Sequence, residues 1–364
     1  MPDDNIGLNT KKPYLMNKSR KSEVPYIVSE KEVLLQRKFF DHLMNLATVD
    51  KFNVYINDDI KGYKNGELLD EDFTGTFLRI QKGKEVEIHE TDIITGYKCN
   101  LSKKFIFKNI LDMDLIKTKN IYKYGVEVNT LKGMQEIINE VLFSKFLMKN
   151  YFTESKDMSI NDMALKRNLL FAREKLFDWF YKGNKVGVYN ILDEASINLV
   201  KGAIENGKLI NASHRFNLRW SLKKYFDGGK DMGDTIYDVR NNLRVKINES
   251  ITSKFDSDEE YYYAVGQLVN YFLSRSKGKK KMHSLANPFF NATNSENINI
   301  KLRALFKKYN YEIEMNSKRF NNLYGMIVGY NTEKKVDQDL ILAGYLQSSL
   351  IYESNKNDGG EING

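Results

Sequence analysis

The sequence is poor in the residue types that build several classes of functional site. Its 364 residues include one cysteine, Cys99, which excludes an internal disulfide and any zinc or iron–sulfur site built from several cysteines. No Walker loop, GxGxxG, GxSxG or HExxH motif occurs. We therefore expect a chain that is not an enzyme and holds no cofactor or metal. The four histidines are too far apart in sequence to indicate a shared site: His42, His89, His214 and His283.

Proline and long apolar runs are also scarce. Four prolines occur, and none lies between Tyr26 and Asn287, so long helices are permitted through most of the chain. No stretch approaches the roughly 18 to 20 uninterrupted apolar residues that a membrane helix needs. The polar start MPDDNIGLNTKK also lacks the apolar stretch of a signal peptide. We expect a cytoplasmic protein with no membrane partner.

The hydrophobic content of 41% is enough for packed cores, and its periodicity changes along the chain. Alternation over 73–90 around Gly83 predicts a β-hairpin, and 103–111 is a third candidate strand. Helical spacing follows Ser29 and recurs over 134–152 and 163–183. Helix starts at Ser257, Ser295, Ser317 and Asp337 indicate a C-terminal bundle. The pattern predicts an α+β fold, in which a mixed N-terminal half with a small antiparallel sheet or hairpin precedes a mainly helical half.

The same pattern predicts four regions. The first has a basic arm at 11–21, and the last lacks apolar residues apart from Ile362, which is typical of a disordered tail. The regions are an N-terminal α+β region (1–118), a helical middle region (119–232), a C-terminal helical bundle (233–353) and the tail (354–364).

The net charge of +8 is concentrated in one part of the chain. Residues 201–281 hold sixteen Lys or Arg and ten Asp or Glu. Five of these cations fall within seven residues at a predicted helix end, where a phosphate backbone could neutralise them while releasing counterions. The alternative is a solvated helix end, since the C-terminal helix dipole favours cations. The five cations are Arg275, Lys277, Lys279, Lys280 and Lys281.

A second basic segment, 212–226, combines cations with aromatic residues. Arg215, Arg219 and Lys223 follow at four-residue intervals and share one helical face, on which they could grip phosphates beside a stacking aromatic ring. The alternative is that the aromatics belong to the core. The residues one step round the helix are Phe216, Trp220 and Lys224.

Neither segment carries a motif that reads base edges, so we expect contact with the backbone that is independent of sequence. Selection of a sequence would then come from a guide or another subunit.

Several segments carry a resemblance to one family. The stretches YYYAVGQLVNYFLSRSKGKKKMHSLANPFFNA (261–292), RFNNLYGMIVGY (319–330) and DLILAGYLQSSLIYE (339–353) resemble the C-terminal part of the large signature subunit of type I-B CRISPR Cascade. KKPYLMNKSRKSEVPYIVSEKE (11–32) and FLRIQKGKEVEI (77–88) are similar to its central part. The chain thus resembles a short or N-terminally reduced form of that subunit.

The resemblance implies a non-catalytic subunit of an RNA-guided complex. Its implied partners are guide RNA, target DNA, the backbone and guide-end-binding subunits, and a recruited helicase–nuclease. The family's helical part is similar to a small subunit that can be made from an internal start, for which Met158, Met163 and Met232 are candidates. The resemblance also implies that the contacts to a nucleic-acid strand come from Arg275 to Lys281 and from Lys318 and Arg319.

Two other functions remain open from the sequence. Asp256 and Asp258 could serve a metal-dependent nuclease, although they also suit a helix N-terminus. Alternatively, the chain is a structural scaffold whose lysines are solvated and whose tyrosine-rich faces bind protein.

Overall fold

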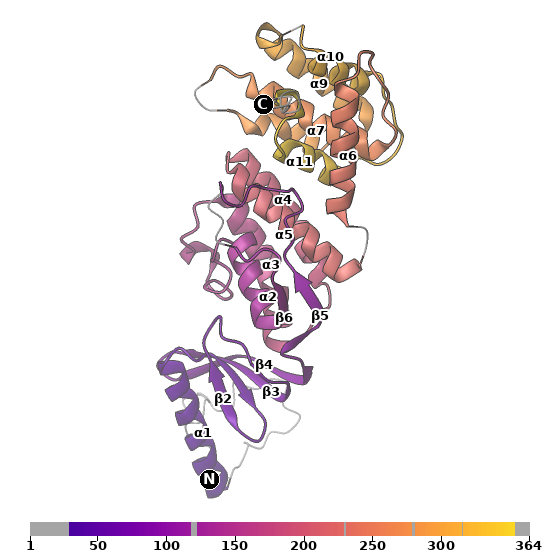
Figure 1. The fold of residues 1–364 in the computed structure, drawn as a ribbon. Coiled ribbons are helices and arrows are strands. Elements are labelled where there is room, and N and C mark those ends of the chain that lie inside the picture. The colour runs from indigo at the N-terminus through magenta and orange to yellow at the C-terminus, as the bar shows by residue number, and fades with distance from the viewer. Residues whose placement is uncertain (1–28, 118–121, 229–230, 279–280, 315, 354–364) are drawn as a thin grey trace, which may run out of the picture.

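A computed structural model describes residues 29–117, 122–228, 231–278, 281–314 and 316–353. The fold is α+β, as the sequence predicts, with eleven α-helices and six strands in these ranges. Figure 1 shows three tiers stacked along the long axis. A sheet tier (30–97) lies at one end, a middle tier (100–227) follows, and a helical bundle (232–352) lies at the other end. The predicted basic arm and C-terminal tail lie outside the described residues.

The sheet tier is built from one helix and an antiparallel sheet. The predicted helix start at Ser29 is confirmed, because the Ser29 hydroxyl accepts from the Glu32 N–H and the Glu32 carboxylate accepts from the Ser29 N–H. The strand order is β2-β1-β3-β4, and β3 and β4 form the predicted hairpin around Gly83. These elements are α1 (Glu30–Thr48), β1 (Asn53–Ile56), β2 (Ile60–Tyr63), β3 (Phe73–Lys82) and β4 (Val86–Tyr97).

The two faces of this sheet are covered differently. One face packs Leu78 and Ile80 against Leu43 of α1. The other face carries Tyr55 and Phe77, which join the core of the middle tier. The sheet therefore shares a core with residues beyond the predicted boundary at 118.

The third candidate strand pairs elsewhere. β5 (Asn100–Ile106) pairs with β6 (Glu127–Thr130) in a separate two-stranded sheet. Phe105 and Phe107 are buried, and the Phe105 ring meets that of Tyr225 with centroids 5.9 Å apart. The apolar side chains of this segment thus bind it to the middle tier and not to the hairpin.

The helix expected over 134–152 is shorter than predicted. α2 (Leu131–Ile137) continues as a π-helical turn to Leu142 and then stops. Ser144 and Lys145 adopt left-handed backbone angles, with φ of 51° and 69°. Phe143 and Leu147 are nevertheless completely buried, so the apolar pattern came from a packed loop. The remaining helices of the tier are α3 (Met163–Lys182), which ends at the predicted Gly183, α4 (Val188–Glu205) and α5 (Leu209–Asp227).

The helical bundle confirms the predicted starts at Ser257, Ser317 and Asp337. At the fourth start the cap is Asn294, whose side chain accepts from the Asn297 N–H, while Ser295 is the first helical residue. No helix in the described ranges is long and apolar enough to cross a membrane. The helices are α6 (Met232–Ile247), α7 (Asp258–Ser274), α8 (Asn287–Phe290), α9 (Ser295–Tyr309), α10 (Lys318–Val328) and α11 (Gln338–Leu346).

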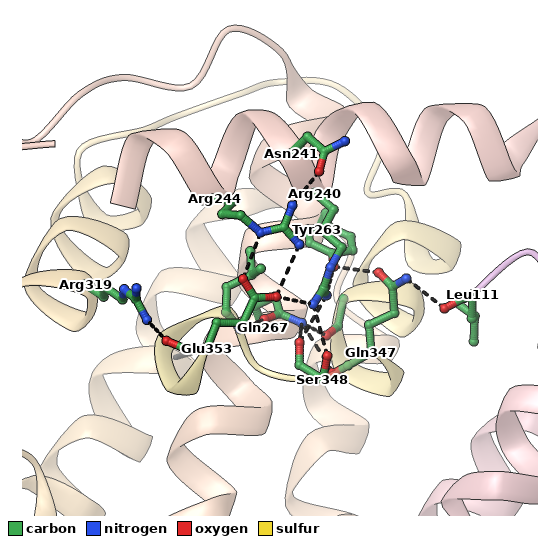
Figure 2. Close-up of polar contacts among 12 residues, drawn as sticks. Leu111, Arg240, Asn241, Arg244, Tyr263, Gln267, Arg319, Gln347, Ser348 and Glu353 are labelled. Atoms are coloured by element: carbon green, nitrogen blue, oxygen red, sulfur yellow. Dashed lines mark hydrogen bonds and ion pairs between the residues drawn. The ribbon is translucent and has the colours of Figure 1, made fainter. Parts of the chain in front are cut away.

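The end of the described chain is held by arginines (Figure 2). The Glu353 carboxylate accepts from Arg240 and Arg244 of α6, each at 2.8 Å, and Arg319 donates to the Glu353 carbonyl. Nearby, the Gln347 amide donates to the Leu111 carbonyl at 2.9 Å. The segment after α11 is therefore tied both to α6 and to the middle tier.

Two glycines allow α7 and α11 to pack backbone against backbone. A Cβ added at Gly266 would lie 2.1 Å from the Ile341 carbonyl oxygen, and one at Gly344 would lie 2.1 Å from that of Tyr263. Both distances are below any normal contact, so the crossing requires glycine at both positions.

We expect Gly266→Ala to lower the free energy of unfolding by about 1–3 kcal/mol, because the methyl group would force the two helices apart. Urea unfolding measures the change. Gly325→Ala is the matched control, since its Cβ would meet only the Thr252 side chain, at 3.3 Å. Equal stability of the two variants would contradict the close crossing.

His214 is buried in α5 beside two tyrosines of the middle tier. Its Nδ1 lies 2.7 Å from the Tyr124 hydroxyl, and its ring meets Tyr122 edge to face. Burial lowers the pKa of His214 from its usual 6.5 to about 4. The folded protein therefore holds the neutral imidazole, whereas the unfolded chain takes up a proton below pH 6.5.

Acidification should destabilise the protein through His214. The contribution of the neutral, buried His214 to the free energy of unfolding is intact above pH 6.5 and is lost as the pH falls toward 4. Between pH 7 and pH 4.5, the free energy of unfolding should fall in both proteins. The fall should be about 2 kcal/mol smaller in His214→Gln than in wild type. Urea unfolding across this range measures both curves, and parallel curves would contradict the assignment.

Candidate nucleic-acid interface

The structure places Arg215 inside the protein. Its side chain is 5% exposed and donates to the Leu199 carbonyl at 3.0 Å, the Val141 carbonyl at 3.4 Å and the Ser144 hydroxyl at 3.2 Å. Burial lowers the pKa of the guanidinium. Arg215 thus ties α5 to α4 and to the turn after α2, and it does not face a surface on which a strand could lie.

Arg219 is buried in the same way. It forms two hydrogen bonds to the Asp339 carboxylate, at 2.9 and 3.1 Å, and an ion pair with Asp193 at 2.9 Å. The Ser196 hydroxyl accepts a further bond at 3.0 Å. The helical face shared by Arg215 and Arg219 points into the core, so we correct the expectation that these two arginines grip phosphates.

Lys223 and Lys224 lie at the surface end of α5. Lys223 is half-buried, pairs with Asp193 at 3.4 Å, and places its ammonium 4.5 Å from the centroid of the Trp220 ring. Lys224 is exposed and pairs with Asp231 at 2.6 Å. The sequence analysis places Lys224 beside Trp220 but groups Lys223 with Arg215 and Arg219, which the helix turns inward.

The Trp220 cleft is a hollow of about 190 Å³ beside this ring. Two segments supply its lysines: Lys103, Lys104 and Lys108 come from β5 and the residues directly after it, and Lys224 comes from α5. The Lys108 backbone N–H donates to the Ser221 hydroxyl at 3.0 Å, which holds the segment after β5 against α5. A second hollow, of about 290 Å³, shares Trp220 and Lys224 and adds Lys223 together with the carboxylates of Asp227, Glu259 and Asp337.

One carboxylate lies among the four lysines that line the cleft. Asp231 accepts from Lys108 and from Lys224, both at 2.6 Å, and also from the Gly233 N–H as the N-cap of α6. Burial alone would raise the pKa of Asp231, but these hydrogen bonds outweigh it and hold the pKa at about 2. Two lysines thus already share one anionic group.

The two lysines of β5 are exposed. Lys104 pairs with Glu127 at 2.6 Å across the two-stranded sheet. Lys103 lies 5.2 Å from the centroid of the Tyr225 ring. No sequence pattern marked Lys103, Lys104 or Lys108 as candidate contacts. The signal available was the segment KKFIFK, but nothing local indicates that it lies against a helix more than a hundred residues later.

The other predicted basic segment is partly engaged. Arg275 donates to the Glu312 carbonyl and lies 5.9 Å from the Tyr271 ring centroid, and Lys277 pairs with Glu312. Lys281 is exposed, whereas Lys279 and Lys280 lie outside the described residues. Lys318 is exposed, and Arg319 is bound to Asn248 and Glu353. Arg275, Lys277, Lys281, Lys318 and Arg319, the described residues of this set, do not line the Trp220 cleft.

The two aspartates considered for a nuclease are engaged with cations. Asp256 pairs with Lys246 at 2.8 Å, and Asp258 pairs with Lys334 at 2.8 Å and accepts from Tyr330 at 3.0 Å. Within the described part of the chain, no group of three or more His, Cys, Asp or Glu side chains is placed to hold a metal ion.

Comparison with known proteins gave no match to a protein-family model, a curated protein or a solved structure.

Proposed function

We propose that this protein binds single-stranded nucleic acid, without catalysing a reaction on it, and that the Trp220 cleft is the contact. The observation that carries the proposal is that four lysines, three from the β5 stretch and one from α5, line one cleft beside the Trp220 ring, and that Asp231 is the single carboxylate in this lining. Sites for single strands combine such cations, which follow the phosphates, with aromatic rings on which bases stack.

The contacts of the cleft suit a phosphate. Asp231 lies between Lys108 and Lys224, so both ammonium groups are already oriented toward one oxyanion. A backbone phosphate would add to this arrangement at the exposed Lys103 and Lys104. A stacked base would take the face of Trp220 that Lys223 now covers, which frees the Lys223 ammonium for a neighbouring phosphate.

We further propose, more specifically, that the protein is a cytoplasmic, non-catalytic subunit of a type I-B Cascade. It is supported by the resemblance of the C-terminal segments to the large subunit. The proposed partners are guide RNA, target DNA, other Cascade subunits and a recruited helicase–nuclease. In such a complex the guide would select the sequence, and this chain would hold a strand by its backbone.

The double variant Lys103→Gln/Lys104→Gln should weaken binding to a labelled oligothymidylate. If both lysines contact phosphates, the slope of log affinity against log salt becomes shallower by about 1.4. Fluorescence anisotropy at several salt concentrations measures the slope.

Two further variants serve as controls. Asp231→Asn keeps a capping side chain at α6 but removes the negative charge, so it should strengthen binding. The triple variant Lys279→Gln/Lys280→Gln/Lys281→Gln removes cations at the other basic segment. Its slope of log affinity against log salt should lie closer to that of wild type than the slope of the Lys103/Lys104 variant does. A wild-type slope in the Lys103/Lys104 variant, with circular dichroism unchanged, would exclude the cleft.

Affinity purification of the tagged chain from its native cells tests whether it is a Cascade subunit. We expect co-purification of short RNAs of uniform length that contain repeat sequence, together with other subunits. Sequencing the RNA and identifying the proteins by mass spectrometry provide the measurement. Recovery of the chain alone would contradict membership of Cascade, while oligonucleotide binding by the purified chain would remain a separate result.

A further inference from the structure

A larger cleft lies between β4 and α3, on the side of the sheet tier that meets the middle tier. Its volume is about 770 Å³. One wall is the stretch of β4 from Glu90 to Gly96, and the other includes Glu174, Phe177 and Asp178 of α3. Ile93 and Ile94 both line it, although successive side chains of a strand point to opposite faces. The β4 cleft therefore runs along the edge of the strand.

β4 is an edge strand in the part of the chain that the structure describes, since β3 is its one partner. Its pairing with β3 is irregular near Ile80 and near Gly75, but Glu90–Ile94 pair regularly with Gly75–Arg79. Bulges shield strand edges, so the regular stretch between them is the open part of this edge. That stretch lies along the β4 cleft.

One backbone N–H on this stretch donates to a side chain and not to the carbonyl oxygen of a neighbouring strand. The Ile93 N–H donates to the carboxylate of its neighbour Asp92 at 2.8 Å. A carbonyl oxygen of an added strand could replace that carboxylate. The Ile93 side chain is 74% exposed, which is unusual for isoleucine in a strand and provides an apolar contact for the same added strand.

The charge of the cleft indicates what kind of strand fits. Four carboxylates line it, against Arg173 and Lys182. Lys182 is nearly buried and pairs with Glu90, with Asp92 at 3.3 Å and with Asp178 at 3.0 Å. Arg173 donates to the carbonyls of Asn150 and Thr153. Glu174 is exposed at the rim, and the lining as a whole is acidic.

We propose that the β4 cleft binds an extended, basic segment of a partner protein, which adds a strand to β4. Backbone hydrogen bonds would provide affinity, while basic side chains beside Asp92 and Glu174 and an apolar one on Ile93 would provide specificity. A second copy of this chain fits poorly, because its own β4 would bring Glu87, Glu90 and Asp92 against the same acidic edge. The proposal does not depend on nucleic-acid binding.

The probe is a fluorescein-labelled octapeptide of alternating lysine and valine, added to the full chain and followed by fluorescence anisotropy. We expect saturable binding. The same peptide with alternate backbone amides N-methylated keeps its charge but cannot pair as a strand, so it should bind at least about tenfold more weakly. Equal binding of the two peptides, or no saturable binding of either, would overturn the proposal.

Variants of the chain locate the site. Ile93→Pro removes the edge N–H, and Glu174→Lys reverses an exposed rim charge without touching the sheet. Each should weaken peptide binding several-fold while oligothymidylate binding stays at the wild-type level. Glu205→Lys, at the exposed end of α4, is the matched control for charge. Peptide binding that is unchanged in Glu174→Lys, or reduced equally in Glu205→Lys, would overturn the assignment to this cleft.

Discussion

The ion pairs of the buried Arg219 with Asp193 and Asp339 join the two larger cores of the molecule. α5 contributes Phe216 to the core of the bundle and Leu218 to the core shared with the sheet. Arg219 follows both residues on the same helix and connects α5 to α4 and α11. A buried charge is tolerated only with its partners in place, and removing one partner typically costs about 3–5 kcal/mol. The position of α5 relative to both neighbours is therefore strongly constrained.

This constraint also places the Trp220 cleft. Trp220 and Lys224 follow Arg219 within two turns of the same helix, so their direction is set by the residue buried before them. β5 then packs on α5 through Phe105 and brings its lysines to the same cleft. Asp231 offsets part of the repulsion between these cations. A concentration of lysines at the surface thus rests on regular secondary structure.

Local sequence patterns predicted much of the secondary structure. The reciprocal bonds of Ser29 and Glu32, the hairpin at Gly83 and the end of α3 at Gly183 depend on neighbouring residues, and all three were predicted. The helix expected through residue 152 was not found past Leu142. Its apolar residues are buried from a loop, and burial imposes an apolar pattern on loops as well as on helices. The partner of β5 likewise depended on a contact between distant residues.

The sequence by itself determined the α+β class, the helix caps at Ser29, Ser257, Ser317 and Asp337, and the combination of basic and aromatic residues in 212–226. Only the tertiary structure decided that Arg215 and Arg219 point inward, and that Lys103, Lys104 and Lys108 join the lysine of α5. Helical periodicity identifies the residues that share a face. When that face carries both charged and apolar residues, periodicity does not show whether it meets solvent or another helix. For Arg219 the deciding partner is Asp339, which lies 120 residues further along the chain.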